Sequence, residues 1–348
     1  MTDRLINFVQ RERLYILVLI FVLVFNVIVL SHGEGKARAK RPAASQAQTF
    51  EDHEIRKHEM EVLLRKNTKL FTIFGLVSLL ILSITLLGLV IDIIIAPMIL
   101  TGTLEIRSSS PLRAKWDMWD VCKVVILFLF FGYMLILSEA FLSRVFPVFK
   151  TDNFRMMVNS SILDVLAVVF IIYFTVIYYK EPLAALGISA KNFLKNVAYG
   201  VVGYIALVPV LILMLVIIAL IINITKYVPE RQPVVELFLK EKGVAFLTYS
   251  SLFAAIIGPI IEELFFRGFL YGALKKYIGI FWAMLVTAIL FAALHAHIVG
   301  FFPIMALGML LAYIYEKTGT LVSSVTVHMI HNLSMVFLVF LVKQAGMI

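Results

Sequence analysis

The sequence predicts an all-α, polytopic membrane protein, a transmembrane helix bundle of eight or nine spans. Hydrophobic residues make up 61% of the 348 residues and charged residues 15%, a composition too apolar for a soluble globular surface. The apolar residues form continuous runs of about 20 residues, the length that crosses a bilayer as a helix. These runs lack the period-two alternation of an outer-membrane barrel.

Eight long runs and one short run account for the expected spans. The short run, residues 301–315, fits either a tilted span or a half-helix buried in protein. The long runs cover residues 14–31, 70–100, 121–142, 157–179, 197–224, 244–265, 280–296 and 321–342.

The positive charge of the chain indicates contact with lipid. Lys and Arg lie in short segments between the apolar runs, without an aromatic-interleaved basic face, so the net charge of +9 fits lipid headgroups. We therefore expect membrane lipids as partners, no nucleic acid, and an integral protein of the cell (plasma or inner) membrane. The first run follows Arg4, Arg11 and Arg13, as a signal peptide would, but its length favours a retained anchor.

The composition changes once along the chain, near Lys180. We predict an N-terminal multi-span region, residues 1–180, with a basic polar loop at 32–69, and a core at 181–343. At the junction, residues 180–200 are predicted to form an interfacial amphipathic helix with Lys191 and Lys195 on its polar side.

Two adjacent glutamates lie inside the run that begins at residue 244. An ionised carboxylate at the bilayer centre costs at least about 2.5 to 3.5 kcal/mol, so such residues need a reason. Glu263 and Arg267 are four apart with the acid first, which favours an ion pair along the helix. Glu262 lies about 100° round the helix and has no such partner. Gly258 and Pro259, one turn upstream, can kink the helix and free backbone carbonyls.

Two later runs add imidazole and amide groups. Phe291 and His295 are four apart, and so are His328 and Asn332, so each pair shares one helical face. His331 lies about 60° off the face of the second pair. A lone membrane histidine is more often a hydrogen-bond partner between helices than a catalyst. It is the conjunction of catalytic residue types on three runs that predicts a site.

Acids elsewhere in the apolar runs are interpreted as structural, because each stands alone without a matching base. They are Asp92, Glu139 and Asp164.

The three patterns together resemble the CAAX prenyl endopeptidase and bacteriocin-processing family of intramembrane proteases, the type II CAAX protease-like (ABI) family. Its signature is EExxxR, then FxxxH, then HxxxN on successive helices. Every signature position is matched, in the same order, and residues 186–188 are similar to the segment by which the family enters its core. The signature residues here are Glu262, Glu263, Arg267, Phe291, His295, His328 and Asn332.

This resemblance implies an intramembrane endopeptidase that hydrolyses a peptide bond with activated water. Glu262 would be the general base, His295 would help to position the water, and His328 with Asn332 would donate hydrogen bonds to the oxyanion. The substrate would be a prenylated CAAX-type tail or another membrane-associated peptide, such as a bacteriocin precursor. The supporting residues would be Glu263 and Arg267, which orient the helix, and Phe291, which packs beside the site.

Other interpretations stay open at this point. No cofactor is expected, but zinc is the alternative, because two histidines and a glutamate form a known catalytic ligand set. Against zinc, the chain has no HExxH pattern, and Asn332 is a poor zinc ligand. A non-catalytic membrane scaffold or bacteriocin-immunity protein with the same fold is the main rival function. A transporter is a third, disfavoured by the lack of recognisable repeated halves.

Overall fold

The computed structural model describes residues 2–33, 67–103, 114–227 and 233–344, together with residues 58 and 62. Most of the basic polar loop predicted at 32–69 therefore lies outside the described residues. The described part of the chain is helical and contains no β-strand, so the predicted all-α class is confirmed. Each of the nine apolar runs lies in a helix, the structure that satisfies backbone polar groups within one segment in a bilayer.

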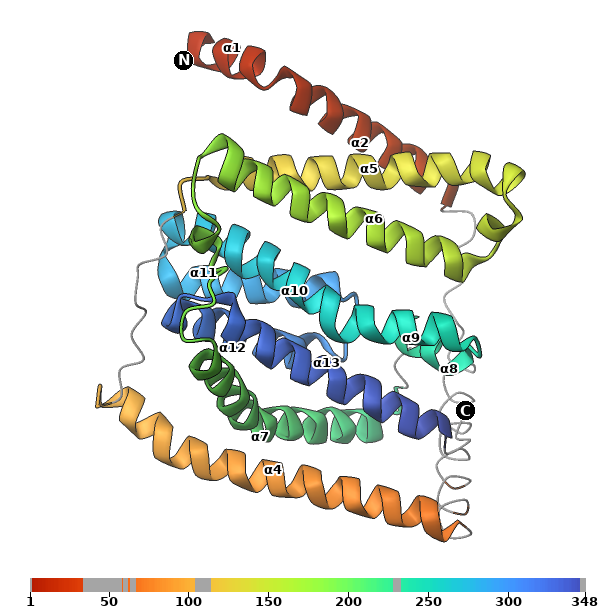
Figure 1. Cartoon of the computed structure of the whole chain (residues 1–348), viewed down its shortest axis with the longest axis vertical. Coiled ribbons are helices and arrows are strands. Elements are labelled where there is room, and N and C mark those ends of the chain that lie inside the picture. The colour runs from red at the N-terminus through yellow and green to blue at the C-terminus, as the bar shows by residue number, and fades with distance from the viewer. Residues whose placement is uncertain are drawn as a thin grey trace. The chain divides into compact units, whose positions relative to one another are not determined.

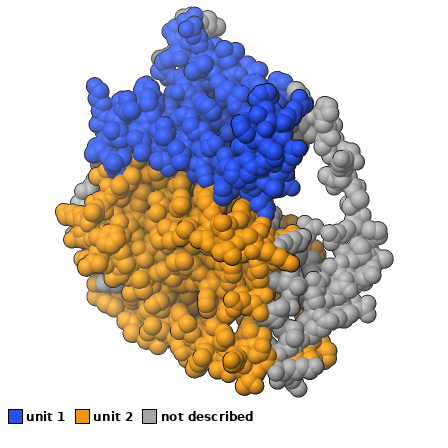
Figure 2. Space-filling view, turned by 45° about the vertical axis from the view of Figure 1, so that its right-hand side comes forward, with its two compact units in different colours: residues 1–40, 114–183 blue, residues 41–113, 184–348 orange. Residues whose placement is uncertain are grey.

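The chain divides into two compact units (Figure 2). One contains residues 1–40 and 114–183, and the other residues 41–113 and 184–348. The prediction placed a boundary at 180/181, close to the break at 183/184, but it assigned residues 41–113 to the N-terminal region. In the structure, helix α4 (Thr68–Leu100) packs along α7 (Phe193–Thr225) and so joins the C-terminal unit.

The first unit is built on three long helices. α2 packs against α5, and α5 packs against α6, which continues directly into the π-helical turn η2. Its elements are α1 (Thr2–Arg11), α2 (Arg13–Gly33), α5 (Met118–Val145), the 3-10 turn η1 (Pro147–Lys150), α6 (Asp152–Ile172) and η2 (Tyr173–Tyr178).

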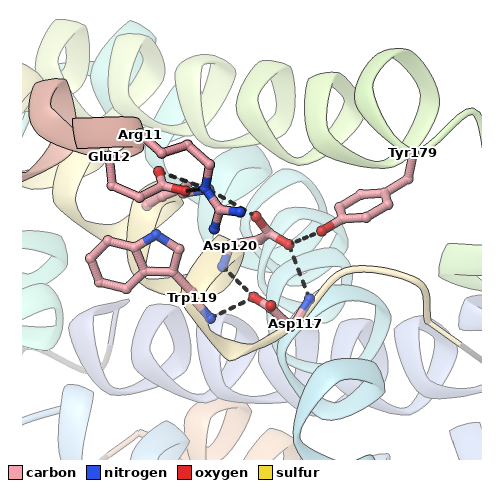
Figure 3. Close-up of polar contacts among 7 residues, drawn as sticks. Arg11, Glu12, Asp117, Trp119, Asp120 and Tyr179 are labelled. Carbon is pink, nitrogen blue, oxygen red and sulfur yellow. Dashed lines mark hydrogen bonds and ion pairs between the residues drawn. The ribbon is translucent and has the colours of Figure 1, made fainter. Parts of the chain in front are cut away.

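A buried polar cluster lies at the start of α5 (Figure 3). Asp117 and Asp120 form a capping box, in which each side chain accepts a hydrogen bond from the backbone N–H of the other residue. The ammonium of Lys123 lies 3.3 Å from the Asp120 carboxylate and 3.2 Å from Glu12. Tyr179 donates to Asp120, and burial together with this bond raises the pKa of Tyr179. The cluster ties the chain near Glu12 to α5 and to the end of η2.

In the second unit, α7 contacts α4, α12 and α13, and α12 contacts α11 (Figure 1). A core of aliphatic side chains from α7, α12 and α13 holds these helices together: Leu207, Leu211, Leu307, Leu311, Ile314 and Val327. The remaining elements of the unit are η3 (Leu183–Leu186), α8 (Pro233–Lys240), α9 (Val244–Leu252), η4 (Phe253–Ile257), α10 (Gly258–Glu263), η5 (Leu264–Tyr271), α11 (Gly272–Leu294), α12 (Phe301–Thr318) and α13 (Leu321–Gln344).

Six of the described helices are long and apolar enough to cross a membrane by length and composition, against the eight or nine spans predicted. One of the six, Val244–Leu294, contains two predicted spans, which are separated where Gly279 leaves the helical conformation at φ 78° and ψ 173°. The first apolar run is not among the six, because the part of it that is described in full, Arg13–Val27, is too short. α12 is not among the six either. The chain is an integral membrane protein, as predicted.

The amphipathic helix predicted for residues 180–200 is wrong. The chain instead makes the single 3-10 turn η3, passes through Gly187 at φ +80°, and starts α7 only at Phe193. Leu186 is fully buried, and the Gly187 carbonyl accepts a hydrogen bond from the N–H of Leu321. A Cβ on Gly187 would lie 2.5 Å from the Tyr315 ring. The segment is thus held at Leu186 and Gly187, which are buried against protein, and its backbone does not form the predicted helix.

Candidate active site

The helix that carries the two glutamates changes its hydrogen-bond register. In η4, the N–H of Gly258 donates to the carbonyl of Phe253, five residues back, instead of the usual four. Pro259, which has no N–H, follows directly. The register widens again in η5, directly after Glu263. Such π-helical turns are rare and frequently lie at functional sites. Both η4 and α10 pack against α13 (Figure 1).

Glu263 and Arg267 form an ion pair that is completely buried. Arg267 Nη1 lies 2.7 Å from Glu263 Oε1, and neither side chain is exposed. The Nη2 of Arg267 donates to the carbonyl of Gly308 at 3.1 Å. Its guanidinium also lies 4.7 Å from the centroid of the Phe291 ring, a cation–π distance. Arg267 therefore joins its own helix to α11 and α12.

His328 lies between the two glutamates. Its Nδ1 is 3.1 Å from Glu263 Oε1, and its Nε2 is 3.8 Å from Glu262 Oε2. Because an ionised carboxylate only accepts, Nδ1 carries the hydrogen in the bond to Glu263. That bond fixes the orientation of the imidazole ring and turns Nε2 toward Glu262.

Glu262 and Glu263 have different surroundings although they are neighbours. The Glu262 side chain is 40% exposed, whereas that of Glu263 is 0% exposed. The Oε2 atom of Glu262 is buried and makes no hydrogen bond with any described residue. Glu263 is held through Oε1 by Arg267 and His328, while its Oε2 is also buried without a partner among the described residues. The difference between the two carboxylates is therefore the engaged Oε1 of Glu263 and the greater exposure of Glu262.

Phe291 packs against both predicted catalytic histidines. Its ring centroid is 4.8 Å from that of His295 and 5.5 Å from that of His328. The Nδ1 of His295 lies 2.7 Å from the backbone carbonyl of Phe291, so Nδ1 is the donor in this bond. In the neutral ring, Nε2 of His295 is then the nitrogen that can accept a hydrogen bond.

Asn332 contacts the backbone of the glutamate helix. Its Nδ2 donates to the carbonyl of Ala254, in η4, at 2.7 Å. The sequence predicted that Gly258 and Pro259 free backbone carbonyls, which a substrate or water could then approach. The Ala254 carbonyl is instead bound by a side chain that the sequence had assigned to the site.

The two remaining histidines of this region have other surroundings. His297 accepts a hydrogen bond from the N–H of Gly300 at 2.9 Å, just before α12. The ring of His331 packs against Tyr204 of α7, with a centroid distance of 6.0 Å.

The sequence missed two backbone groups of this region, the carbonyls of Ala254 and Gly308. Neither residue type carries a chemical signal of its own. Only Pro259 gave a hint, because a proline deprives one upstream carbonyl of its helical donor.

No three His, Cys, Asp or Glu side chains in the described ranges form a group that could hold a metal ion. The polar contacts gather two carboxylates, a guanidinium and an imidazole, and the guanidinium and the imidazole each lie beside an acid.

These features define a polytopic helical membrane protein with an acid–imidazole cluster enclosed in one helical unit. Residues 244–334 match the model of the family described as type II CAAX prenyl endopeptidase Rce1-like. The matched segment includes all seven residues that the sequence assigned to the site, so the resemblance is confirmed for this part of the chain.

A relative supports the same assignment. The protein described as "Putative membrane peptidase YdiL" of Bacillus subtilis (strain 168) is 30% identical over 79 residues. The aligned part is 23% of this chain and 32% of the relative, so the chain spans about a third of the length of the curated relative it matches. No solved structure matches the chain.

Proposed function

We propose that this protein is an intramembrane endopeptidase that hydrolyses a peptide bond of a membrane-associated substrate with water activated by Glu262. The observation that carries the proposal is the unequal engagement of two adjacent carboxylates. The Oε1 of Glu263 is held by Arg267 and His328, and the side chain is fully buried. The buried Oε2 atoms of both glutamates lack a hydrogen-bond partner among the described residues, but the Glu262 side chain is 40% exposed and can be reached by water. A general base needs a carboxylate that is free to take up a proton.

The hydrolysis assigns one proton path to Glu262. The carboxylate takes a proton from water as the water oxygen attacks the scissile carbonyl carbon. It returns this proton to the amide nitrogen as the C–N bond breaks, which yields a carboxylic acid and an amine. His295, whose Nδ1 bonds to the Phe291 carbonyl, offers Nε2 as an acceptor to hold the same water.

The oxyanion formed in this step needs hydrogen-bond donors. His328 supplies one of these donors from Nε2 when both ring nitrogens carry a hydrogen. In that form the two negative carboxylates are balanced by the positive charges of Arg267 and the imidazolium. Asn332 supplies the other from the second hydrogen of its amide, the first being bonded to Ala254. Both donors are set in place before the reaction, which is the source of their catalytic effect.

The substrate that we propose is a prenylated CAAX-type tail, with other membrane peptides as the alternative class. The basis is the family of residues 244–334 and the location of the cluster in a membrane unit. The full chain in lipid nanodiscs should be given farnesylated CAAX-type peptides and identical peptides without the lipid. Faster cleavage of the farnesylated set supports the tail, and equal rates support a broader peptide specificity.

The mechanism is tested by Glu262→Gln, which keeps the shape of the side chain but removes the base. We expect kcat to fall by about 100-fold or more. Asp92→Asn is the matched control, because it makes the same acid-to-amide change in a membrane helix of the same unit, and it should leave the rate unchanged. Equal cleavage by wild type and Glu262→Gln would contradict the proposal.

Two further outcomes separate the rival functions. If a chelator abolishes cleavage and added zinc restores it, the glutamate and histidines act as metal ligands and the water is activated by the metal. If no peptide is cleaved and Glu262→Gln supports the cellular phenotype as well as wild type does, the protein is a non-catalytic scaffold.

A further inference from the structure

We propose that Pro259 is a positioning residue of this site, which acts by leaving the Ala254 carbonyl free to anchor the amide of Asn332. Its catalytic consequence rests on the proposed endopeptidase function, while the anchor itself is a statement about hydrogen bonding that can be tested without activity.

The hydrogen-bond register of η4 isolates one carbonyl. The N–H of Gly258 is used by the carbonyl of Phe253, five residues back. In this register the next carbonyl, that of Ala254, faces the nitrogen of Pro259, which carries no hydrogen. In the ordinary four-residue register Ala254 would use Gly258, whose N–H is already taken. The Ala254 carbonyl thus has no donor within its own helix.

A side chain from another helix supplies the missing donor. Asn332 Nδ2 lies 2.7 Å from the Ala254 oxygen, and α13 packs directly against η4. In the hydrocarbon region water does not satisfy a freed carbonyl, so a donor from protein is strongly favoured. Proline is tolerated in membrane helices when neighbouring groups supply the lost hydrogen bond in this way.

The anchor decides how Asn332 presents its amide. An amide turned by 180° would bring its oxygen against the Ala254 oxygen, two acceptors in contact, so only one orientation is compatible with the bond. One hydrogen of Nδ2 is then committed to Ala254, and the direction of the second is fixed. A donor whose direction is fixed before the substrate arrives loses no rotamer freedom on reaction.

A double-mutant cycle of stability tests the anchor on the full chain. Pro259→Ala restores an N–H that can bond to Ala254, so Asn332→Ala should lower the thermal midpoint clearly in wild type and little in the Pro259→Ala background. Pro209→Ala is the control, because it also restores an N–H at a buried proline inside a membrane helix, but in α7 and not in the helix that contains Ala254. In that background the effect of Asn332→Ala should equal its effect in wild type.

The same variants give the kinetic arm. Pro259→Ala should lower kcat by about 10-fold or more and leave KM unchanged, because the donor is mispositioned while the substrate still binds. Asn332→Ala alone should cost about 100-fold, and the double variant should be no slower than Asn332→Ala alone, because the proline has no amide left to position. A proline that only bends the helix would give independent, multiplicative effects. Pro259→Ser restores the same N–H and replaces the alanine variant if that variant does not fold.

The outcomes distinguish this inference from the function on which it rests. Additive stability effects of Pro259→Ala and Asn332→Ala overturn the anchor, even if wild type cleaves peptides. Coupled stability effects in a protein that cleaves nothing uphold the anchor and reject the endopeptidase. Coupling in both arms supports the positioning role.

Discussion

At the scale of single residues, the buried ion pair of Glu263 and Arg267 organises the candidate site. Arg267 contacts its own helix through Glu263, α12 through the Gly308 carbonyl and α11 through the Phe291 ring. Glu263 in turn holds Nδ1 of His328. The imidazole of His328 is therefore oriented by groups that take no part in the proposed reaction.

Arg267→Ala is expected to destabilise the protein strongly. Removing one partner of a fully buried pair leaves an uncompensated charge and costs about 3 to 5 kcal/mol. The thermal midpoint in detergent should fall accordingly, and Arg267→Lys should be intermediate because an ammonium lacks the planar fork that serves two acceptors. Arg144→Ala, at an exposed position of α5, is the control and should change stability by less than about 0.5 kcal/mol. A wild-type midpoint for Arg267→Ala would show that the pair does not stabilise the fold.

Much of this residue-scale arrangement follows from spacing. The four-residue interval between Glu263 and Arg267 predicts their ion pair, and adjacency places Glu262 on another face of the helix. The partners from other helices could not be predicted, because His328 is 65 positions and Gly308 41 positions away along the chain. Contacts at that range depend on tertiary packing.

At the scale of elements, the helices are held together by close steric packing. Lipid does not provide the hydrophobic driving force between helices that water provides in a soluble protein. α4 and α7 meet at Gly88, where a Cβ would lie 2.3 Å from the Ile205 carbonyl oxygen and 2.7 Å from Pro209 Cδ. Small residues at such points let membrane helices pack by van der Waals contact. Most of α4 is otherwise apolar and exposed, a surface suited to lipid.

Gly88→Ala should therefore loosen α4 from α7. The added methyl meets backbone and ring atoms that cannot give way, and overpacking of this kind costs about 1 to 3 kcal/mol. Gly75→Ala lies in the same helix with nothing within 4 Å of its Cβ, so its stability should be unchanged or slightly raised. Thermal unfolding of the two variants compares them directly. Equal midpoints would mean that α4 does not rely on this contact.

The hydrogen-bond register within the helix from 244 to 294 could not be predicted from the sequence. Its apolar runs indicate two spans, and Gly279 separates them. The π-helical turns around α10 have no periodic signature, because one extra residue in a turn leaves an apolar run equally apolar. Pro259 is compatible with a kink, but the five-residue register of η4 and its contact with α13 have no counterpart in the sequence pattern.

At the scale of the whole molecule, polar groups are concentrated in a few buried clusters within each unit. In the first unit, Glu12 is 4% exposed and Lys123 is 6% exposed. Burial opposes ionisation of Glu12, but its hydrogen bond and ion pair with Lys123 outweigh burial and lower the pKa of Glu12. The cluster stabilises the unit only while the carboxylate is ionised.

The first unit should therefore be sensitive to acid through Glu12. Because its folded-state pKa is below the unfolded value of about 4.3, the stabilisation is complete above that pH and is lost as the pH falls through the folded value. The thermal midpoint of wild type should drop more than that of Glu12→Gln as the pH is lowered from about 5 to about 2, across the unfolded pKa and down through the folded one. Parallel pH curves for the two proteins would refute a role for this carboxylate.

The sequence by itself determined the class of the protein, the helical runs and the residues that match the family signature. These are local properties, since a continuous apolar run must be helical in a bilayer and motif spacing is read along one chain. Only the tertiary structure decided that α4 joins the C-terminal unit, that Leu186 and Gly187 are buried between helices, and that Asn332 bonds to Ala254. Each of these depends on which helices pack together, and in a membrane that choice rests on steric fit and hydrogen bonds between helices, which the order of apolar residues does not encode.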